Sequence, residues 1–175
     1  MQEAEVSLRI AIKYIQTGET EENVFVSIDG AHIKTKDTVH FDLAAFMRQN
    51  GYAKCDGNEE RWQGEYCACG YAPHIFVSSK PGVGDVNITL KDGRVLYIES
   101  KKLKSGSGGE YPAMREAIGQ LMTGCPDDGN IIPVVAVPHT AKSEELARKW
   151  SCSKRICAAG IRFMLVRDCG EIAFI

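Results

Sequence analysis

Residues 84–101 constrain the fold more than any other segment, because they have the pattern of a single β-hairpin. Two short strands with alternating apolar side chains flank Asp92-Gly93, a common turn pair. In the second strand Glu99 and Lys101 are two residues apart, so both side chains project from one face, roughly 6–7 Å apart along the strand. A carboxylate and an ammonium group placed in this way can hold a divalent cation and polarise a water molecule beside it.

The position of Asp85 relative to these two residues depends on the turn. A two-residue turn would place Asp85 opposite Ser100, whereas a three-residue loop ending at a left-handed Gly93 would place it opposite Glu99. A one-residue slip moves every side chain to the other face, so the hydrophobic pattern decides between the two registers. The three-residue loop is favoured because it gathers the apolar side chains on one face: Val86, Ile88, Leu90, Leu96 and Ile98. The opposite face then carries the polar set: Asp85, Asn87, Tyr97, Glu99 and Lys101.

This pattern resembles the PD-(D/E)xK nuclease superfamily. Residues 81–85, Pro-Gly-Val-Gly-Asp, correspond to its first acidic motif, and Glu99-Ser100-Lys101 corresponds to the second. From Lys80 to about Gly124 the chain is also similar to the virus-type replication-repair nuclease branch, in which a helix bearing a glutamine follows; here that residue is Gln120. The resemblance implies an α/β fold with a restriction-endonuclease-like core in the order α-β-β-β-α-β. It also implies a central mixed sheet flanked by helices, with additions at both ends of the chain.

The same resemblance implies a metal-dependent nuclease that hydrolyses phosphodiester bonds. Asp85 and Glu99 would bind Mg²⁺ or Mn²⁺, which prefer hard oxygen ligands, and the backbone carbonyl of Ser100 or Ile98 would add a further oxygen. Lys101 would orient the attacking water and stabilise the charged transition state. Gln120 is the expected accessory catalytic residue. In this superfamily an acid of the first helix often points into the site, and Glu5 is the candidate here.

The segment after the hairpin is expected to be a loop over residues 105–109 followed by a helix from Pro112 to about Thr123. Its apolar residues recur at helical spacing and would cover the sheet. Gln120 lies at the flank of that apolar stripe and is expected to reach the end of the sheet. Glu116 points nearly the opposite way and is expected to face solvent.

A formal net charge of −2 is not typical of a dedicated nucleic-acid-binding protein, so attraction to phosphate has to come from a local patch. We expect the substrate to be nucleic acid, with DNA favoured over RNA, and several side chains near the motif to contact it: Lys80, Lys102, Lys104, Tyr111 and Arg115. A second basic group, Arg148, Lys149, Lys154 and Arg155, is interpreted as a solvated helix face. Endonuclease and exonuclease action both stay open.

The chain has seven cysteines, and an odd number argues against a disulfide framework in a reducing compartment. Cys55, Cys67, Cys69 and His74 together offer the ligand types of a zinc site. Because Cys-x-Cys is not the usual Cys-x-x-Cys spacing, ordinary thiols on adjacent strands are the favoured interpretation and Zn²⁺ is the alternative.

The whole chain, 1–175, is expected to form one nuclease-like domain with a catalytic core at about 74–140 and an insertion at about 24–70. Outside the hairpin the patterns predict the following elements: a helix 3–16, a hairpin 24–34 around Asp29-Gly30, a helix 41–50, strands 61–66 and 74–79, a strand 131–137, a helix from 143 to about 150, and a final hairpin pairing 161–166 with 171–175.

No apolar run approaches the roughly 20 residues of a membrane span, so a cytoplasmic protein without a membrane partner is expected. A homodimer is an open alternative to a monomer. Two other functions also stay open: a non-catalytic nucleic-acid-binding or interaction module on the same fold, and a small zinc-binding protein in which the cysteine group is the functional part.

Overall fold

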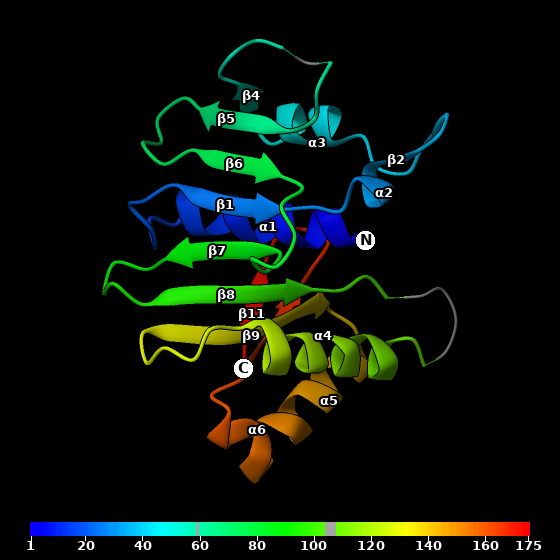
Figure 1. The fold of residues 1–175 in the computed structure, drawn as a ribbon, viewed down its shortest axis with the longest axis vertical. Coiled ribbons are helices and arrows are strands. Elements are labelled where there is room, and N and C mark those ends of the chain that lie inside the picture. The colour runs from blue at the N-terminus through cyan, green and yellow to red at the C-terminus, as the bar shows by residue number, and fades with distance from the viewer. Residues whose placement is uncertain (59, 104–107) are drawn as a thin grey trace.

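The protein folds around one large mixed sheet with helices on both faces (Figure 1). The structure is a computed structural model and describes residues 1–58, 60–103 and 108–175. Within these residues nine strands lie in the order β11-β10-β9-β8-β7-β1-β6-β5-β4, and a separate two-stranded sheet joins β2 (Lys34–Thr35) to β3 (Thr38–Val39). The prediction of an α/β fold with a central mixed sheet flanked by helices is confirmed.

The first helix, α1 (Glu3–Gln16), lies against one face of the sheet. Its apolar residues extend most of the way around the helix, as expected of a helix that is buried on nearly every side. The core on this side also contains inward-facing residues of β1 (Val24–Ser27) and β7 (Val86–Thr89). The predicted helix 3–16 therefore has the observed bounds.

The second face carries α4 (Glu110–Gly124), which covers β8 (Val95–Ser100) and β9 (Ile131–Pro138). Residues 134–137 of β9 are buried without interruption because both faces of the strand are covered there, which explains their unbroken apolar sequence. Next to α4 lies α5 (Ala141–Ser151), which begins at a capping box formed by Thr140 and Ser143. A short helix, α6 (Lys154–Ala158), follows and was not predicted.

The sequence prediction fails most clearly at residues 24–34. No hairpin forms there: β1 pairs in parallel with β6 (Ile75–Ser78) and antiparallel with β7, in the middle of the sheet. Asp29 then caps α2 (Gly30–Ile33) by accepting a hydrogen bond from the Ala31 amide at 2.9 Å. An Asp-Gly pair is typical of a hairpin turn, but Asp is also a favoured helix cap, and here the long-range pairing of β1 decides between the two.

The other elements are close to their predicted ranges. Helix α3 is Leu43–Gln49, and β5 is Gly64–Ala68, paired on its outer side with an unpredicted edge strand, β4 (Tyr52–Lys54). The C-terminal hairpin forms as predicted, between β10 (Arg162–Val166) and β11 (Ile172–Phe174). Residues 24–70 thus supply β1, β4 and β5 to the same sheet that carries the β7–β8 hairpin and its acidic face.

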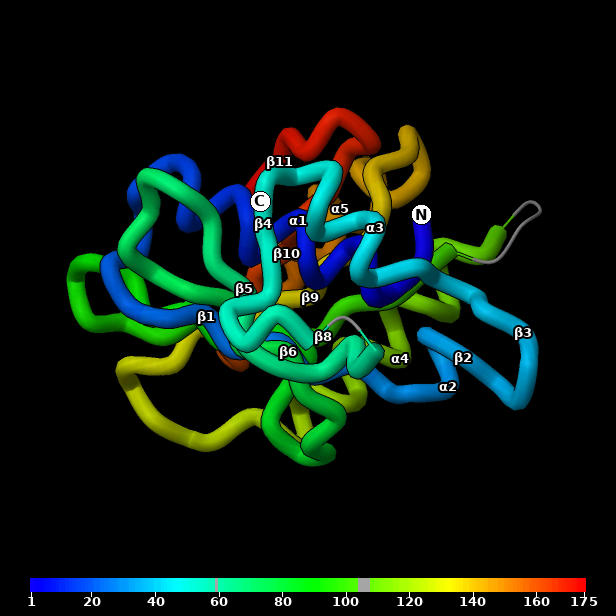
Figure 2. Tube along the Cα trace, turned by 90° about the horizontal axis from the view of Figure 1, so that it is seen from above, coloured from blue at the N-terminus to red at the C-terminus, as the bar shows by residue number. Residues whose placement is uncertain are grey.

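No helix of the described residues is long and apolar enough to cross a membrane. Figures 1 and 2 place the N-terminal end of α1, the short helix α2 and the end of β8 on the same side of the molecule. The acidic motif lies at this end of the sheet.

Candidate active site

The β7–β8 hairpin has the register that brings Asp85 opposite Glu99. Val86 pairs with Ile98 and Thr89 pairs with Val95, and the Leu90 amide donates to the Arg94 carbonyl at 2.8 Å. Residues 91–93 therefore form a three-residue loop, and Gly93 adopts a φ of 83°, in the left-handed region. The predicted register is confirmed, and the pairing that buries the apolar face also assembles the acidic face.

Asp85 is fixed at the edge of this hairpin by backbone contacts. Its amide donates to the Ile98 carbonyl at 2.8 Å, and its carboxylate Oδ2 accepts a hydrogen bond from the Ser100 amide at 2.7 Å. The preceding residue, Gly84, has a φ of 71° and passes so close to the Tyr97 ring that a Cβ atom there would lie 2.9 Å from it. Only glycine meets both conditions, and the close passage brings Asp85 directly onto β8.

The negative charges of Asp85 and Glu99 repel each other. Burial is the main cause that raises the pKa of Asp85 to about 7, and the negative charge of Glu99 adds to it; Lys101 and the Ser100 amide act in the opposite direction. Burial also raises the pKa of Glu99, while Lys101 lowers it and Glu3 raises it. Two partly dehydrated carboxylates with raised pKa values form a site that a divalent cation would stabilise.

Lys101 lies near both carboxylates and is almost fully buried, with 7% of its surface exposed. Its ammonium nitrogen is 3.4 Å from Oε1 of Glu3, the first residue of α1, and 3.9 Å from Glu116 on α4. The same Glu3 carboxylate accepts a hydrogen bond from the Lys102 amide at 3.4 Å and lies 3.7 Å from Nδ1 of His32. A buried lysine therefore stands between the hairpin carboxylates and an acid from the first helix.

Two adjoining cavities, of about 680 and 430 Å³, open onto these groups. Both are lined by Asp85 and Glu99 from the hairpin, by Gln120 from α4 and by Asp29 at the end of β1. Lys101 and Glu3 line the smaller cavity, and Tyr97 lines the larger one. A solvent-accessible space thus lies directly in front of the carboxylate pair.

Several residues proposed from the sequence lie at these cavities. Gln120 lines both of them, as expected from its position on the helix. Lys80 lines the larger cavity and Lys102 the smaller one. Glu116 is exposed, as expected, yet its carboxylate also borders the smaller cavity beside Lys101.

Other proposed residues are not brought to the site. Glu5 is bound by Arg9 one helical turn away, at 2.8 Å, and Glu3 occupies the place expected for it. Tyr111 packs edge-on against Trp150, and the guanidinium of Arg115 lies over the Tyr111 ring, so both side chains turn toward α5. Lys104 lies outside the described residues. The second basic group is exposed on α5 and α6, as expected of a solvated face.

Sequence reasoning missed Glu3, Asp29 and His32. The apolar stripe of α1 was the only guide to its orientation, and it selected Glu5; since the helix is buried nearly all around, the stripe discriminates poorly. Asp29 and His32 follow β1, a strand that was assigned to a hairpin. The useful signal was polar residues directly after a buried strand, at the same sheet end as Asp85.

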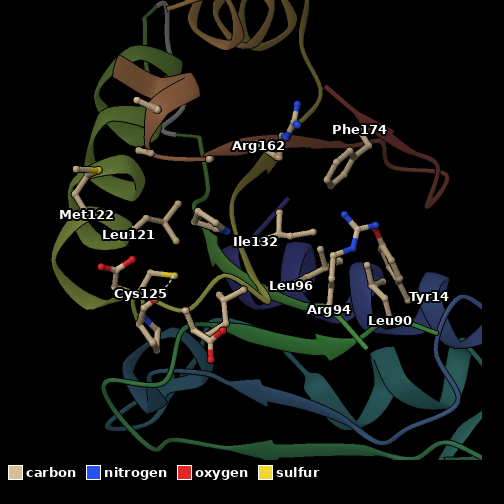
Figure 3. A pocket seen from close by; sticks show the side chains of 18 of the residues that line it. Tyr14, Leu90, Arg94, Leu96, Leu121, Met122, Cys125, Ile132, Arg162 and Phe174 are labelled. Atoms are coloured by element: carbon tan, nitrogen blue, oxygen red, sulfur yellow. Dashed lines mark hydrogen bonds between the residues drawn. The ribbon is translucent and has the colours of Figure 1, made fainter. Parts of the chain in front are cut away.

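A cavity of about 910 Å³, larger than either of the two acidic cavities, lies elsewhere (Figure 3). It is lined by the end of α4, the β7–β8 loop and the C-terminal strands, including Leu121, Arg94 and Phe174. Within the described ranges it shares no lining residue with the two acidic cavities. The carboxylate pair and the buried lysine lie at the other end of the hairpin, so this larger cavity is not the candidate active site.

No protein-family model, curated protein or solved structure matches this chain.

Proposed function

We propose that the protein is a metal-dependent nuclease that hydrolyses phosphodiester bonds in nucleic acid, with DNA as the favoured substrate. The observation that carries this proposal is the meeting of Asp85, Glu99 and the buried Lys101 at one accessible cavity. The ordinary alternative is that these three residues form only the charged outer face of a hairpin, but the side chains of such a face would be solvated. Here the lysine is 7% exposed and the pKa values of both carboxylates are raised by burial.

The donor set fits a hard divalent cation. Asp85 and Glu99 would hold Mg²⁺ or Mn²⁺ through carboxylate oxygens, with the Ser100 carbonyl as the further ligand expected from the motif. The fit has support in the electrostatics, because burial, and after it repulsion by Glu99, raises the pKa of Asp85 to about 7, and the charge of a bound cation would offset both effects. When bound, such an ion supplies a water of lowered pKa and neutralises charge that develops on the phosphate.

Lys101 has two roles in this proposal. Its ammonium group presents hydrogen-bond donors at the cavity, so it can orient a water molecule for in-line attack and stabilise negative charge on the phosphoryl oxygens. Glu3 holds that ammonium group at 3.4 Å, which limits the positions open to a long and flexible side chain. Gln120 presents an amide at the same cavity and would orient the water or the phosphate.

The order of elements around the site also supports the proposal. Helix α1 leads into β1, which pairs in the sheet with the β7–β8 hairpin, and α4 and β9 follow that hairpin; the segment from α2 to β6 lies between β1 and β7 in the chain. This is the α-β-β-β-α-β order expected of a restriction-endonuclease-like core. Lys80 and Lys102 line the cavities and would contact the backbone of the substrate on either side of the scissile phosphate.

The test is cleavage of plasmid, linear duplex, single-stranded and branched DNA and of RNA, with Mg²⁺, with Mn²⁺ and with a chelator. The wild type is compared with Lys101→Ala and with Lys149→Ala, an exposed lysine of α5 that serves as the control. We expect metal-dependent cleavage that falls by about 10²–10³-fold in Lys101→Ala and is unchanged in Lys149→Ala. No cleavage of any substrate would overturn the proposal. Salt-sensitive DNA binding without cleavage would favour the non-catalytic module instead.

A further inference from the structure

A second group of ligand-type side chains lies at the outer edge of the sheet, on β4, β5 and β6. In the β4–β5 pair, Cys55 follows β4 directly and its amide donates to the Glu65 carbonyl at 3.0 Å. In the β5–β6 pair, Tyr66 faces Ile75, so Cys67 and His74 are the next pair in the same register. Glu65 and Cys67 are two residues apart on β5 and therefore project from one face. Three segments thus bring two thiols, an imidazole and a carboxylate together.

The distances within this group are short enough for one ion to touch several of its atoms. Nδ1 of His74 lies 2.6 Å from Oε1 of Glu65 and 4.0 Å from Sγ of Cys55. The ligand atoms of Cys55, Glu65 and His74 all lie within 4.8 Å of one another. Cys67 lies outside this group of three, on the face of β5 that carries Glu65 and opposite His74 in the continued register. Ligands of a tetrahedral zinc ion are roughly 3–4 Å apart, since zinc–ligand bonds are about 2.0–2.3 Å long.

We propose that Cys55, Cys67, His74 and Glu65 bind one Zn²⁺ ion. Thiolate and imidazole ligands select zinc over magnesium, and a single carboxylate completes a four-coordinate set. Binding of the ion displaces the two thiol protons and any proton shared between His74 and Glu65, and those protons are released to solvent. Cys69 lies in the turn after β5, beyond the paired residues that carry the other ligands, so Glu65 takes its place and the zinc ligand set differs from the one proposed from the sequence.

This zinc site is separate from the candidate active site. Strand β6 runs parallel to β1, and the Ser27 amide at the end of β1 donates to the Asp85 carbonyl at 2.8 Å. The end of β6 therefore lies at the same end of the sheet as Asp85, with β1 between them, whereas His74 precedes β6 and lies at the opposite end. The ion would tie the edge strand β4 to its two neighbours, which is the role of a structural site with all positions filled by protein ligands.

The first experiment is elemental analysis of protein expressed with added zinc and then dialysed without a chelator. We expect about one Zn²⁺ per chain in the wild type and in Cys69→Ser, and a loss of at least about tenfold in zinc affinity in Cys55→Ser and His74→Ala. Wild-type protein with less than about a tenth of an equivalent, or full zinc content in both variants, would overturn the proposal.

Cobalt titration of metal-free wild-type protein covers the case in which a variant does not fold. Thiolate-to-cobalt charge-transfer absorption that saturates at one equivalent and is reversed by zinc is the expected result. Absence of that absorption, or a Cys55–Cys67 disulfide in freshly purified protein, would overturn the site. The double variant Asp85→Asn, Glu99→Gln is expected to keep its zinc; loss of zinc in that variant would assign the ion to the acidic cavity instead.

Discussion

Lys101 and Glu3 form an ion pair at 3.4 Å between the second strand of the hairpin and the first residue of α1. Residues 98 positions apart in the chain are joined here with little exposure to water, since 9% of the lysine side chain and 15% of the glutamate side chain are accessible. This contact connects the Glu99-Ser100-Lys101 segment to the N-terminal helix. Its removal should affect both stability and the position of the lysine.

Glu3→Gln is expected to destabilise the protein by about 1–3 kcal/mol, because it leaves a buried ammonium group with a neutral partner. Metal-dependent cleavage should fall as well, since Lys101 is less firmly held. The matched control is Glu5→Gln, which breaks only the partly exposed pair with Arg9 and should cost about 0.3–1 kcal/mol. Chemical denaturation and initial cleavage rates measure both effects. Equal effects of the two substitutions would contradict the assignment of Glu3 to the site.

The hairpin and its acidic face were predictable because they depend on local information. The turn residues, the alternation of apolar residues and the left-handed Gly93 all lie within residues 84–101, and together they fix the register. Helices α1, α4 and α5 were predictable for the same reason. Glu3 was not, because the rotation of α1 about its axis depends on surfaces that pack against almost all of its sides.

The placement of β1 depends on long-range strand pairing, which the sequence does not reveal. Val24–Ser27 alternates like any half-buried strand, and nothing local indicates that it pairs with β6, about 50 residues later, and with β7. The same long-range pairing places Asp29 at the acidic cavities. The same pairing also brings β6 and β5 into the sheet. The registers across β4, β5 and β6 then place Glu65, rather than Cys69, beside Cys55 and His74. Side chains that meet only through long-range strand pairing share no local sequence pattern from which their meeting could be predicted.

The raised pKa of Asp85 predicts a pH-dependent stability in the absence of metal. Between its ordinary value of 3.8 and about 7, the folded protein retains a proton that the unfolded chain has lost. The stabilising contribution is therefore fully present below about pH 4 and is lost as the pH rises through 7. From pH 5.5 to pH 8 in a chelator, the wild type should lose about 2 kcal/mol relative to Asp85→Asn, measured by urea denaturation.

Divalent metal supplies the control for this prediction. At pH 8, saturating Mg²⁺ should stabilise the wild type, because a cation replaces the proton between the carboxylates, and should have a much smaller effect on Asp85→Asn. Parallel pH curves for the two proteins, together with equal responses to Mg²⁺, would show that Asp85 is neither protonated near neutral pH nor part of a metal site.

Gln120→Ala is expected to slow cleavage by about tenfold or more without changing the unfolding transition, because Gln120 is exposed and lines both acidic cavities. Met122→Ala is the control: Met122 is on the same helix, 62% exposed, and lines the separate cavity shown in Figure 3. Cleavage rates measured at several Mg²⁺ concentrations separate loss of turnover from weaker metal binding. A rate unchanged in Gln120→Ala would remove this residue from the catalytic group.

Two glycines before Asp85 test how closely the backbone must approach Tyr97. Gly82 and Gly84 have nearly the same conformation, with φ values of 74° and 71°, but only Gly84 lies against the ring; a Cβ at Gly82 meets nothing within 4 Å. Gly82→Ala should therefore cost only the left-handed backbone strain, about 1–2 kcal/mol. Gly84→Ala adds a contact of 2.9 Å with a ring that is 5% exposed, so an additional 1–3 kcal/mol or so is expected.

The same pair of substitutions distinguishes stability from catalysis. Relief of the overlap at Gly84 requires the backbone before Asp85 to move away from Tyr97, which would displace the Asp85 carboxylate from the Ser100 amide. Cleavage by Gly84→Ala should therefore fall at temperatures where the protein is still fully folded, whereas Gly82→Ala should retain the wild-type rate. The double variant Gly84→Ala, Tyr97→Leu, which removes most of the obstructing ring, should regain part of the lost stability. If it does not, the close approach to Tyr97 is not what requires a glycine at position 84.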